Sequence, residues 1–221
     1  WLEPPSQPRA ACLRAQMDFE TVSYYSRNAQ TVAERYESVV SSLSMSFGEA
    51  FKAQSRLLDI GCGSGRDLAL LASLGHECFG VDATPEFVAL SQSLHPELKG
   101  KVQHAALPNF EPPFGGDFDG VLCSAVLMHI AESELVPAAL SIKRCLKNQG
   151  RLLYSVPSKR LDVVTENRDA NGRLLVPDQS DRLQKIFEQL GFSLISKWDN
   201  ADSLGRDSVE WISVLMELTN A

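Results

Sequence analysis

The chain has 221 residues, of which 44% are hydrophobic and 22% charged, and this ordinary globular composition excludes a disordered or fibrous chain. A formal net charge of −7 gives no general attraction to phosphate backbones or anionic lipids, so we expect no membrane partner and disfavour a nucleic-acid substrate. Five cysteines without CxxC spacing indicate neither a disulfide framework nor a zinc site, and we expect no metal. Four of them lie among apolar residues and are predicted to be buried thiols: Cys62, Cys78, Cys123 and Cys145.

The chain is predicted to contain one domain, over residues 20–221, preceded by an N-terminal extension over residues 1–19 that lies outside the fold. It has no apolar run long enough to span a membrane, and we expect no signal peptide. The simplest interpretation is a cytoplasmic protein, either a monomer or a homodimer.

Apolar residues between positions 24 and 43 recur at spacings of three and four, which predicts an amphipathic helix. A strand at 56–60, a glycine turn and a helix at 68–74 follow, and Gly75 ends that helix. The alternation then continues with predicted strands at 77–81, 101–104, 118–123 and 150–156 and helices at 85–94 and 132–146.

The stretch 157–177 is polar and is predicted to be irregular, after which a helix begins at Asp178 or Ser180 and ends at Leu190. Two final strands, 192–199 and 209–218, are joined by a turn-rich connection and predict an antiparallel hairpin. The expected fold is α/β, with a doubly wound, mostly parallel seven-stranded sheet whose last strand is antiparallel.

Three glycines follow the first predicted strand directly, at positions 61, 63 and 65, and such glycines let a ligand approach the backbone. Asp82 ends the next strand, where a carboxylate in a doubly wound sheet accepts hydrogen bonds from ribose hydroxyls. Arg66 stands where a dinucleotide-binding loop needs glycine, and Asp59 before the loop would repel a pyrophosphate. The pattern therefore predicts a nucleoside site that does not bind a dinucleotide.

Four segments resemble, in order, the signature segments of class I S-adenosylmethionine-dependent methyltransferases, which have a Rossmann-like fold. They are LLDIGCGSGRD at 57–67, GVD at 80–82, FDGVLCSAVLMHI at 118–130 and LKNQGRLLYSVP at 146–157. The resemblance covers residues 20–218 and implies S-adenosylmethionine as cofactor, with S-adenosylhomocysteine as product.

The resemblance also implies roles for single residues. Gly61, Gly63 and Gly65 would line the amino-acid part of the cofactor, Asp59 its ammonium group, Asp82 the ribose and Ala83 the adenine. Backbone amides at Ala106 and Leu107 would contact adenine, although Ala106 stands where many relatives carry an acidic residue. Ser124 would contact cofactor or substrate, and the first helix would be a lid bearing Tyr25 near the cofactor. Arg35 or Arg66 could pair with the cofactor carboxylate.

His129 could accept a proton from the methyl acceptor, or it could be a structural histidine that packs the next helix. The basic residues Lys159, Arg160, Arg168 and Arg173 would suit an anionic acceptor, or they could be solvated loop charges. We expect methyl transfer to an oxygen, nitrogen or sulfur of a small molecule. A tRNA or protein methyltransferase and a non-catalytic cofactor-binding regulatory protein are the alternatives.

Overall fold

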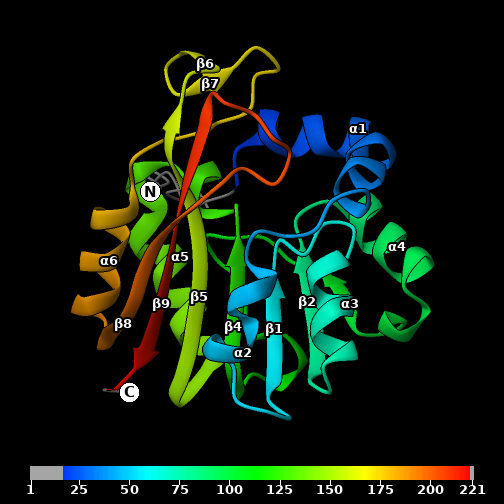
Figure 1. Ribbon diagram of the computed structural model, residues 1–221, viewed down its shortest axis with the longest axis vertical. Helices are drawn as coiled ribbons and strands as arrows, with labels where there is room; N and C mark the ends of the chain where they lie inside the picture. The colour runs from blue at the N-terminus through cyan, green and yellow to red at the C-terminus, as the bar shows by residue number, and fades with distance from the viewer. Residues whose placement is uncertain (1–16, 220–221) are drawn as a thin grey trace, which may run out of the picture.

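The computed structural model describes residues 17–219, which form a twisted seven-stranded sheet in the order β3-β2-β1-β4-β5-β9-β8 (Figure 1). The last strand of the chain, β9, runs antiparallel to both of its neighbours, and the other pairs are parallel, which confirms the predicted sheet. The strands of this sheet are β1 (Arg56–Ile60), β2 (Glu77–Asp82), β3 (Val102–His104), β4 (Phe118–Ser124), β5 (Leu146–Arg160), β8 (Phe192–Asn200) and β9 (Val209–Leu218).

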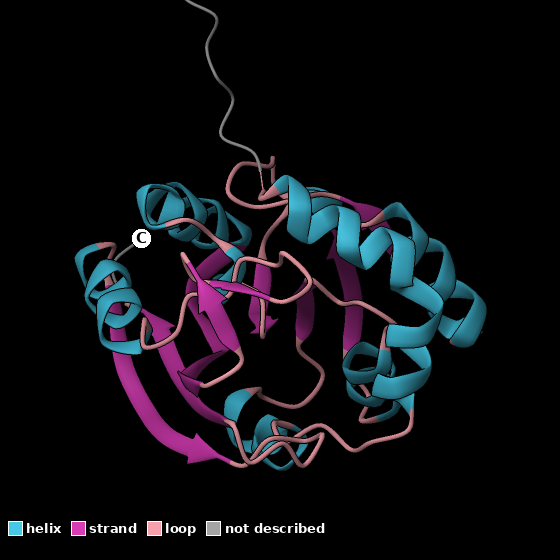
Figure 2. Cartoon of the chain, turned by 90° about the horizontal axis from the view of Figure 1, so that it is seen from above, coloured by secondary structure: helices cyan, strands magenta, loops and turns pink. Residues whose placement is uncertain are grey.

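Helices lie on both sides of the sheet, as the view from above shows (Figure 2). The α-helices are α1 (Phe19–Glu37), α2 (Phe47–Ala50), α3 (Arg66–Ser73), α4 (Pro85–Leu94), α5 (Leu135–Cys145) and α6 (Ser180–Gln189). Short 3₁₀ turns are Ser44–Ser46, Pro96–Leu98, Pro113–Gly115, Leu127–His129 and Glu132–Glu134.

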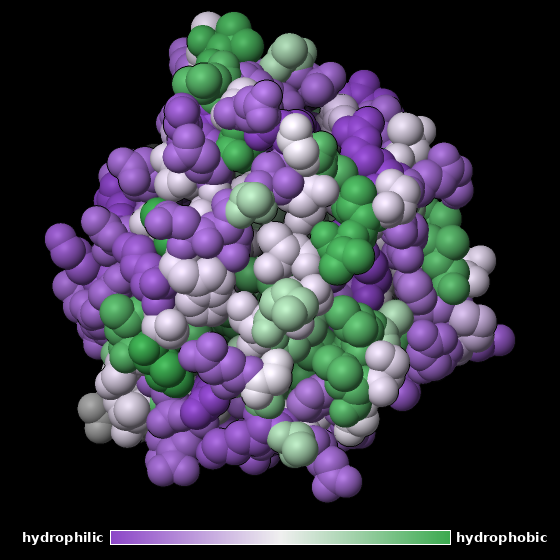
Figure 3. All heavy atoms as spheres, viewed as in Figure 1, coloured by the Kyte–Doolittle hydropathy of each residue, from purple (hydrophilic) through white to green (hydrophobic). Residues whose placement is uncertain are grey.

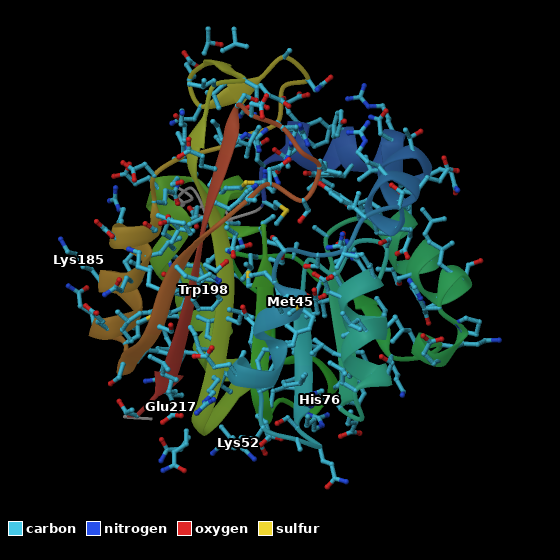
Figure 4. The ribbon with its side chains drawn as sticks, viewed as in Figure 1. Met45, Lys52, His76, Lys185, Trp198 and Glu217 are labelled. Atoms are coloured by element: carbon cyan, nitrogen blue, oxygen red, sulfur yellow. The ribbon has the colours of Figure 1, made fainter. Side chains whose placement is uncertain are left out.

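Successive side chains of one strand point to opposite faces of the sheet, and here both faces are buried. Leu58 of β1 packs in a cluster with α5 and α6, whereas Leu57 packs in a second cluster with α2 and α3. Trp198 of β8 lies against the second cluster, and Lys185 on the outer side of α6 points into solvent (Figure 4). The sheet is therefore buried on both faces, and its ligand sites are confined to the strand ends.

Helix α1 begins earlier and ends earlier than the predicted helix at 24–43. Asp18 caps it by accepting a hydrogen bond from the Thr21 amide at 2.9 Å, so Asp18 and Phe19, expected in the extension, belong to the fold. The helix ends at Glu37, and Leu43 is buried beside α2 from a turn outside the helix. Beyond Glu37, Leu43 thus reflects core packing and not continued helix, whereas Val40 is exposed. Residues 1–16 of the expected extension lie outside the described residues.

The stretch 157–177 is more regular than predicted. Strand β5 continues to Arg160 because β9 pairs with it as far as Val209, and β6 (Val163–Thr165) and β7 (Arg168–Asp169) then form a small hairpin. The hairpin stands above the sheet at the end where α1 lies (Figure 1). Apolar residues gather over it (Figure 3), where Leu161 and Val164 are exposed.

All four cysteines predicted to be buried are free and buried, which confirms that interpretation. No helix within residues 17–219 is both long and apolar enough to cross a membrane.

Candidate active site

A cavity opens at the carboxyl ends of β1, β2 and β4, beneath α1. Parallel strands of a doubly wound sheet bring their loops together at this edge, which is where such folds bind ligands. The residues predicted for the site that line the cavity are Tyr25, Asp59, Gly61, Gly63, Arg66, Asp82, Ala83, Ala106, Leu107, Ser124 and His129. Arg35 and Gly65 do not line it.

Arg35 and Gly65 have structural positions instead. Arg35 is exposed in the last turn of α1, where the helix dipole stabilises a positive charge. It does not lie on the buried face of that helix. Gly65 has φ +89°, and a Cβ there would lie 2.9 Å from Leu98 Cδ1 and 3.1 Å from Ser91 Cβ. The third glycine is therefore required for the close approach of the α3 N-terminus to α4, and its contact with the cofactor stays a prediction.

The first two glycines shape the cavity wall in different ways. Gly61 has φ +75°, and a Cβ on it would lie 2.3 Å from a methyl carbon of Val126. Gly63 has φ +55°, and no atom lies within 4 Å of the position that its Cβ would take. A side chain at Gly63, which lines the cavity, would therefore meet open space, whereas one at Gly61 would collide with the wall.

Asp82 holds the glycine loop to the end of β2. Its Oδ2 accepts from the Gly63 amide at 2.9 Å, and its Oδ1 accepts from the Thr84 amide at 2.8 Å. Burial raises the pKa of Asp82, and these hydrogen bonds partly oppose the rise. Each oxygen keeps one lone pair, so the carboxylate can still accept from a ligand hydroxyl.

Asp59, at the end of β1, has an unpaired oxygen. Its side chain is 3% exposed, and its Oδ1 has no hydrogen-bond partner in the structure. Burial raises the pKa of Asp59 well above its usual value, and the nearby carboxylates of Asp67 and Asp82 add to the rise. A buried carboxylate without a partner costs free energy, and a cationic donor in the cavity would remove that cost.

Arg66 joins the glycine loop to the end of α1. Its Nε donates to Asp67 Oδ1 at 2.9 Å, and its Nη1 donates to the Tyr36 carbonyl at 3.1 Å. Ser41 donates to the other oxygen of Asp67 at 3.1 Å. The connection that follows α1 is therefore fixed against the start of α3.

His129 and Tyr25 are linked by hydrogen bonds that determine the histidine tautomer. His129 Nδ1 lies 2.6 Å from the Leu174 carbonyl, which can only accept, so Nδ1 carries the proton. His129 Nε2 then accepts from the Tyr25 hydroxyl at 3.2 Å, and Arg173 Nη1 donates to the same hydroxyl at 3.2 Å. The pKa of His129 is lowered to about 4, mainly by burial and also by the Arg173 and Arg160 guanidinium groups, against the opposing Leu174 hydrogen bond. His129 is thus neutral near pH 7, and its lone pair is already occupied.

The connection between β8 and β9 also lines the cavity and was not predicted to do so. Ser203 and Leu204 line the wall, and Ser203 Oγ accepts from the Ser42 amide at 3.0 Å. Asp202 accepts from the Trp211 indole at 2.9 Å and from Arg206. The only sequence signal was a turn-rich composition, which predicts a loop but does not reveal that it folds over the strand ends.

Comparisons with known proteins identify the family. A family model described as a methyltransferase domain matches residues 29–197, more than half of the chain. The chain belongs to the class I S-adenosylmethionine-dependent methyltransferases. Among related methyltransferases, it is 30% identical over 161 residues to the uncharacterized methyltransferase YcgJ of Bacillus subtilis, covering 67% of this chain and 62% of that protein. It is 32% identical over 111 residues to the mitochondrial ubiquinone biosynthesis O-methyltransferase of Schizosaccharomyces pombe, covering 48% of this chain and 39% of that protein.

A solved methyltransferase structure shares this fold. The 1,6-didemethyltoxoflavin-N1-methyltransferase of Burkholderia thailandensis superposes with a TM-score of 0.69 at 18% identity, covering 100% of this chain and 94% of that one. This chain spans less than two thirds of the length of the two curated methyltransferases named above. No group of three or more His, Cys, Asp or Glu side chains in residues 17–219 is placed to hold a metal ion.

Proposed function

We propose that the cavity binds S-adenosylmethionine and that the chain transfers its methyl group to an oxygen, nitrogen or sulfur of a small molecule. The observation that carries this proposal is the unpaired, buried Oδ1 of Asp59 at the head of the glycine loop. The amino-acid end of the cofactor carries an ammonium group, which would donate to that oxygen and neutralise its charge.

The rest of the cavity wall suits the remaining parts of the cofactor. Gly63 leaves the backbone open to a ligand, and Asp82 would accept from the ribose hydroxyls with its free lone pairs. Ala83, Ala106 and Leu107 would lie along the adenine. No carboxylate stands at Ala106, so backbone groups would supply the polar contacts to the base.

The chain would contribute alignment and exclusion of water. When bound, the cofactor supplies a sulfonium-activated methyl group for an in-line displacement, which needs orientation more than acid or base catalysis. Tyr25 on α1 covers the cavity, held by Arg173 and His129. The Nε2 lone pair of His129 is occupied by Tyr25, so we propose that His129 positions the lid and is not the base that we considered from the sequence.

A small acceptor is supported by how the cavity is covered. The Leu174 amide donates to Thr21 Oγ1 at 2.9 Å, which ties the loop after β7 to α1. The Ser42 amide ties the β8–β9 connection to the segment after α1 on another side. Because these hydrogen bonds hold segments over the cavity on two sides, the cavity suits a molecule that fits inside it better than a nucleic acid or a protein surface.

Calorimetry on the wild-type chain and Asp59→Asn tests the cofactor assignment. The wild type should bind both S-adenosylmethionine and S-adenosylhomocysteine. Asp59→Asn should bind them about tenfold or more weakly, because a hydrogen bond to a charged group contributes roughly 1.5–3 kcal/mol. Glu77→Gln, at the far end of β2 and outside the cavity, is the control and should bind normally. Failure of the wild type to bind either ligand would reject the proposal.

Two further measurements separate the alternatives. Binding of tRNA at moderate salt would favour a macromolecular substrate. Tight cofactor binding without methyl transfer to any small acceptor would favour a regulatory protein.

A further inference from the structure

The arginines around the cavity differ in how many of their nitrogens have partners. Arg173 uses all three, since Nε and Nη2 donate to Asp169 and Nη1 donates to Tyr25. Arg160 donates from Nε and Nη2 to Asp162, at 2.7 and 2.5 Å, and its Nη1 has no partner among the described residues. Arg160 therefore keeps one charged terminal nitrogen free. Arg66 and Arg206 also line the cavity, and each has one terminal nitrogen without a partner among the described residues, but their side chains are 23% and 33% exposed, so water can satisfy those nitrogens.

The Arg160 guanidinium is buried in the cavity wall and is not a solvated charge on a loop. Arg160 ends β5 opposite Val209, its side chain is 2% exposed, and it lines the cavity. The two carboxylate oxygens of Asp162 bind Nε and Nη2 in a bidentate ion pair, which fixes the plane of the guanidinium group. A buried guanidinium normally has its donors satisfied, so an oriented donor without a partner indicates a site for an acceptor oxygen.

Arg160 ends β5, which β4 separates from β1 and the glycine loop that follows it. Its guanidinium is close enough to His129 to lower the pKa of that imidazole. Met128 and Trp211 pack together in one apolar cluster and also line the cavity. The indole N–H of Trp211 is used by Asp202, so the rest of the ring offers the cavity an apolar surface.

The other basic residues of this region have no such position. Lys159 is exposed and pairs with Glu210 at 2.9 Å outside the cavity, and Arg168 pairs with Asp18. Of the four basic residues in residues 157–177, only Arg160 combines burial, contact with the cavity and a free terminal nitrogen.

We propose that the methyl acceptor carries a carboxylate on an apolar body, and that Nη1 of Arg160 binds this carboxylate beside the wall formed by Met128 and Trp211. This inference rests on the proposed function, because it assigns the remainder of the cavity to the acceptor. Arg160 is a specificity-determining residue in this scheme, and the methylated atom lies elsewhere on the acceptor.

Paired probes test the carboxylate preference. Benzoate, indole-3-carboxylate and octanoate are titrated by calorimetry into protein saturated with S-adenosylhomocysteine, and each is compared with its own carboxamide. At least one carboxylate should bind about tenfold tighter than its amide, the effect of one hydrogen bond between charged groups. Arg160→Gln should reduce that preference to within about twofold. Lys159→Gln removes the same charge from the adjacent residue and should keep the preference.

Every other outcome overturns the proposal. Carboxylates that fail to bind, carboxylates that bind no better than their amides, and equal losses in Arg160→Gln and Lys159→Gln each exclude a specific site at Arg160. A tenfold loss of S-adenosylhomocysteine affinity in Arg160→Gln would assign this arginine to the carboxylate of the cofactor. Normal S-adenosylhomocysteine binding without a carboxylate preference rejects this inference alone, whereas absent S-adenosylhomocysteine binding rejects the proposed function.

The comparison of carboxylates with amides on the wild type does not depend on the folding of a variant. Arg160→Lys is the second variant; it keeps the charge and should keep part of the preference.

Discussion

Acidification should destabilise the protein through His129, and replacing this residue should remove that effect. Its pKa falls from 6.5 to about 4 in the folded chain, because the neutral imidazole is buried against two arginines. Between these values the unfolded chain binds a proton that the folded chain does not. The stability contributed by neutral His129 is therefore complete above pH 6.5 and is lost as the pH falls towards 4.

The size of the effect follows from the two pKa values. One pKa unit corresponds to about 1.4 kcal/mol, so the whole loss is about 3 kcal/mol, of which about 2 kcal/mol falls between pH 7 and pH 5. Urea denaturation of wild type and His129→Asn at these two pH values measures it. The wild type should lose about 2 kcal/mol more of its free energy of unfolding than the variant does.

The comparison uses a difference between pH values because His129→Asn also loses hydrogen bonds at any pH. His104→Gln, which removes an exposed imidazole, is the control and should keep the wild-type pH dependence. If His129→Asn showed the full wild-type loss between pH 7 and pH 5, the proposed neutral, occupied state of His129 would be wrong.

Four further predictions concern the glycine loop and the lid helix α1. Gly63→Ala should cost only about 1 kcal/mol of stability for its left-handed backbone. It should weaken S-adenosylhomocysteine binding about tenfold, since a methyl group on this cavity-lining residue would hinder a ligand that approaches the backbone. Gly61→Ala should instead cost about 2 kcal/mol or more in urea denaturation, because its Cβ collides with the wall. Tyr25→Phe should lower the free energy of unfolding by about 1 kcal/mol through the lost hydrogen bonds, and an unchanged urea midpoint would show that the hydroxyl does not secure the lid. Burial raises the pKa of Asp18, but hydrogen bonds from Arg168 and Thr21 outweigh it and lower the pKa to about 2. Asp18→Asn should therefore cost about 1 kcal/mol at neutral pH, and its difference from wild type in urea denaturation should shrink as the pH falls from about 4 towards 2.

The occupied state of His129 bears on the acceptor chemistry. A cavity whose histidine lone pair is held by Tyr25 suits an acceptor atom that is nucleophilic without deprotonation by the protein, or one that ionises readily by itself. Comparing methyl-transfer rates of acceptors that differ in the pKa of the accepting group would show which of these applies.

Much of the fold could be predicted from local patterns. The alternation of apolar strands and helices, with Gly75 ending one of the helices, was sufficient for the parallel strands, because buried parallel strands leave strong apolar runs. The turn-rich connection between the last two strands predicted the antiparallel last strand. Gly61, Gly63, Asp59 and Asp82 could be placed at the site because they are adjacent to strand ends, and parallel strand ends meet at one edge.

The remaining features depend on contacts between segments far apart in the chain. Gly65 belongs to helix packing, which is visible only when Leu98 and Ser91 lie against it. The free nitrogen of Arg160 likewise becomes distinct from the other basic residues only once their partners are known. The sequence by itself determined the nucleoside site at the strand ends and carried the resemblance to the methyltransferase family, which implied the methyl donor. Which side chains retain unpaired donors and acceptors was decided by tertiary structure, because hydrogen-bond satisfaction is a property of neighbours in space.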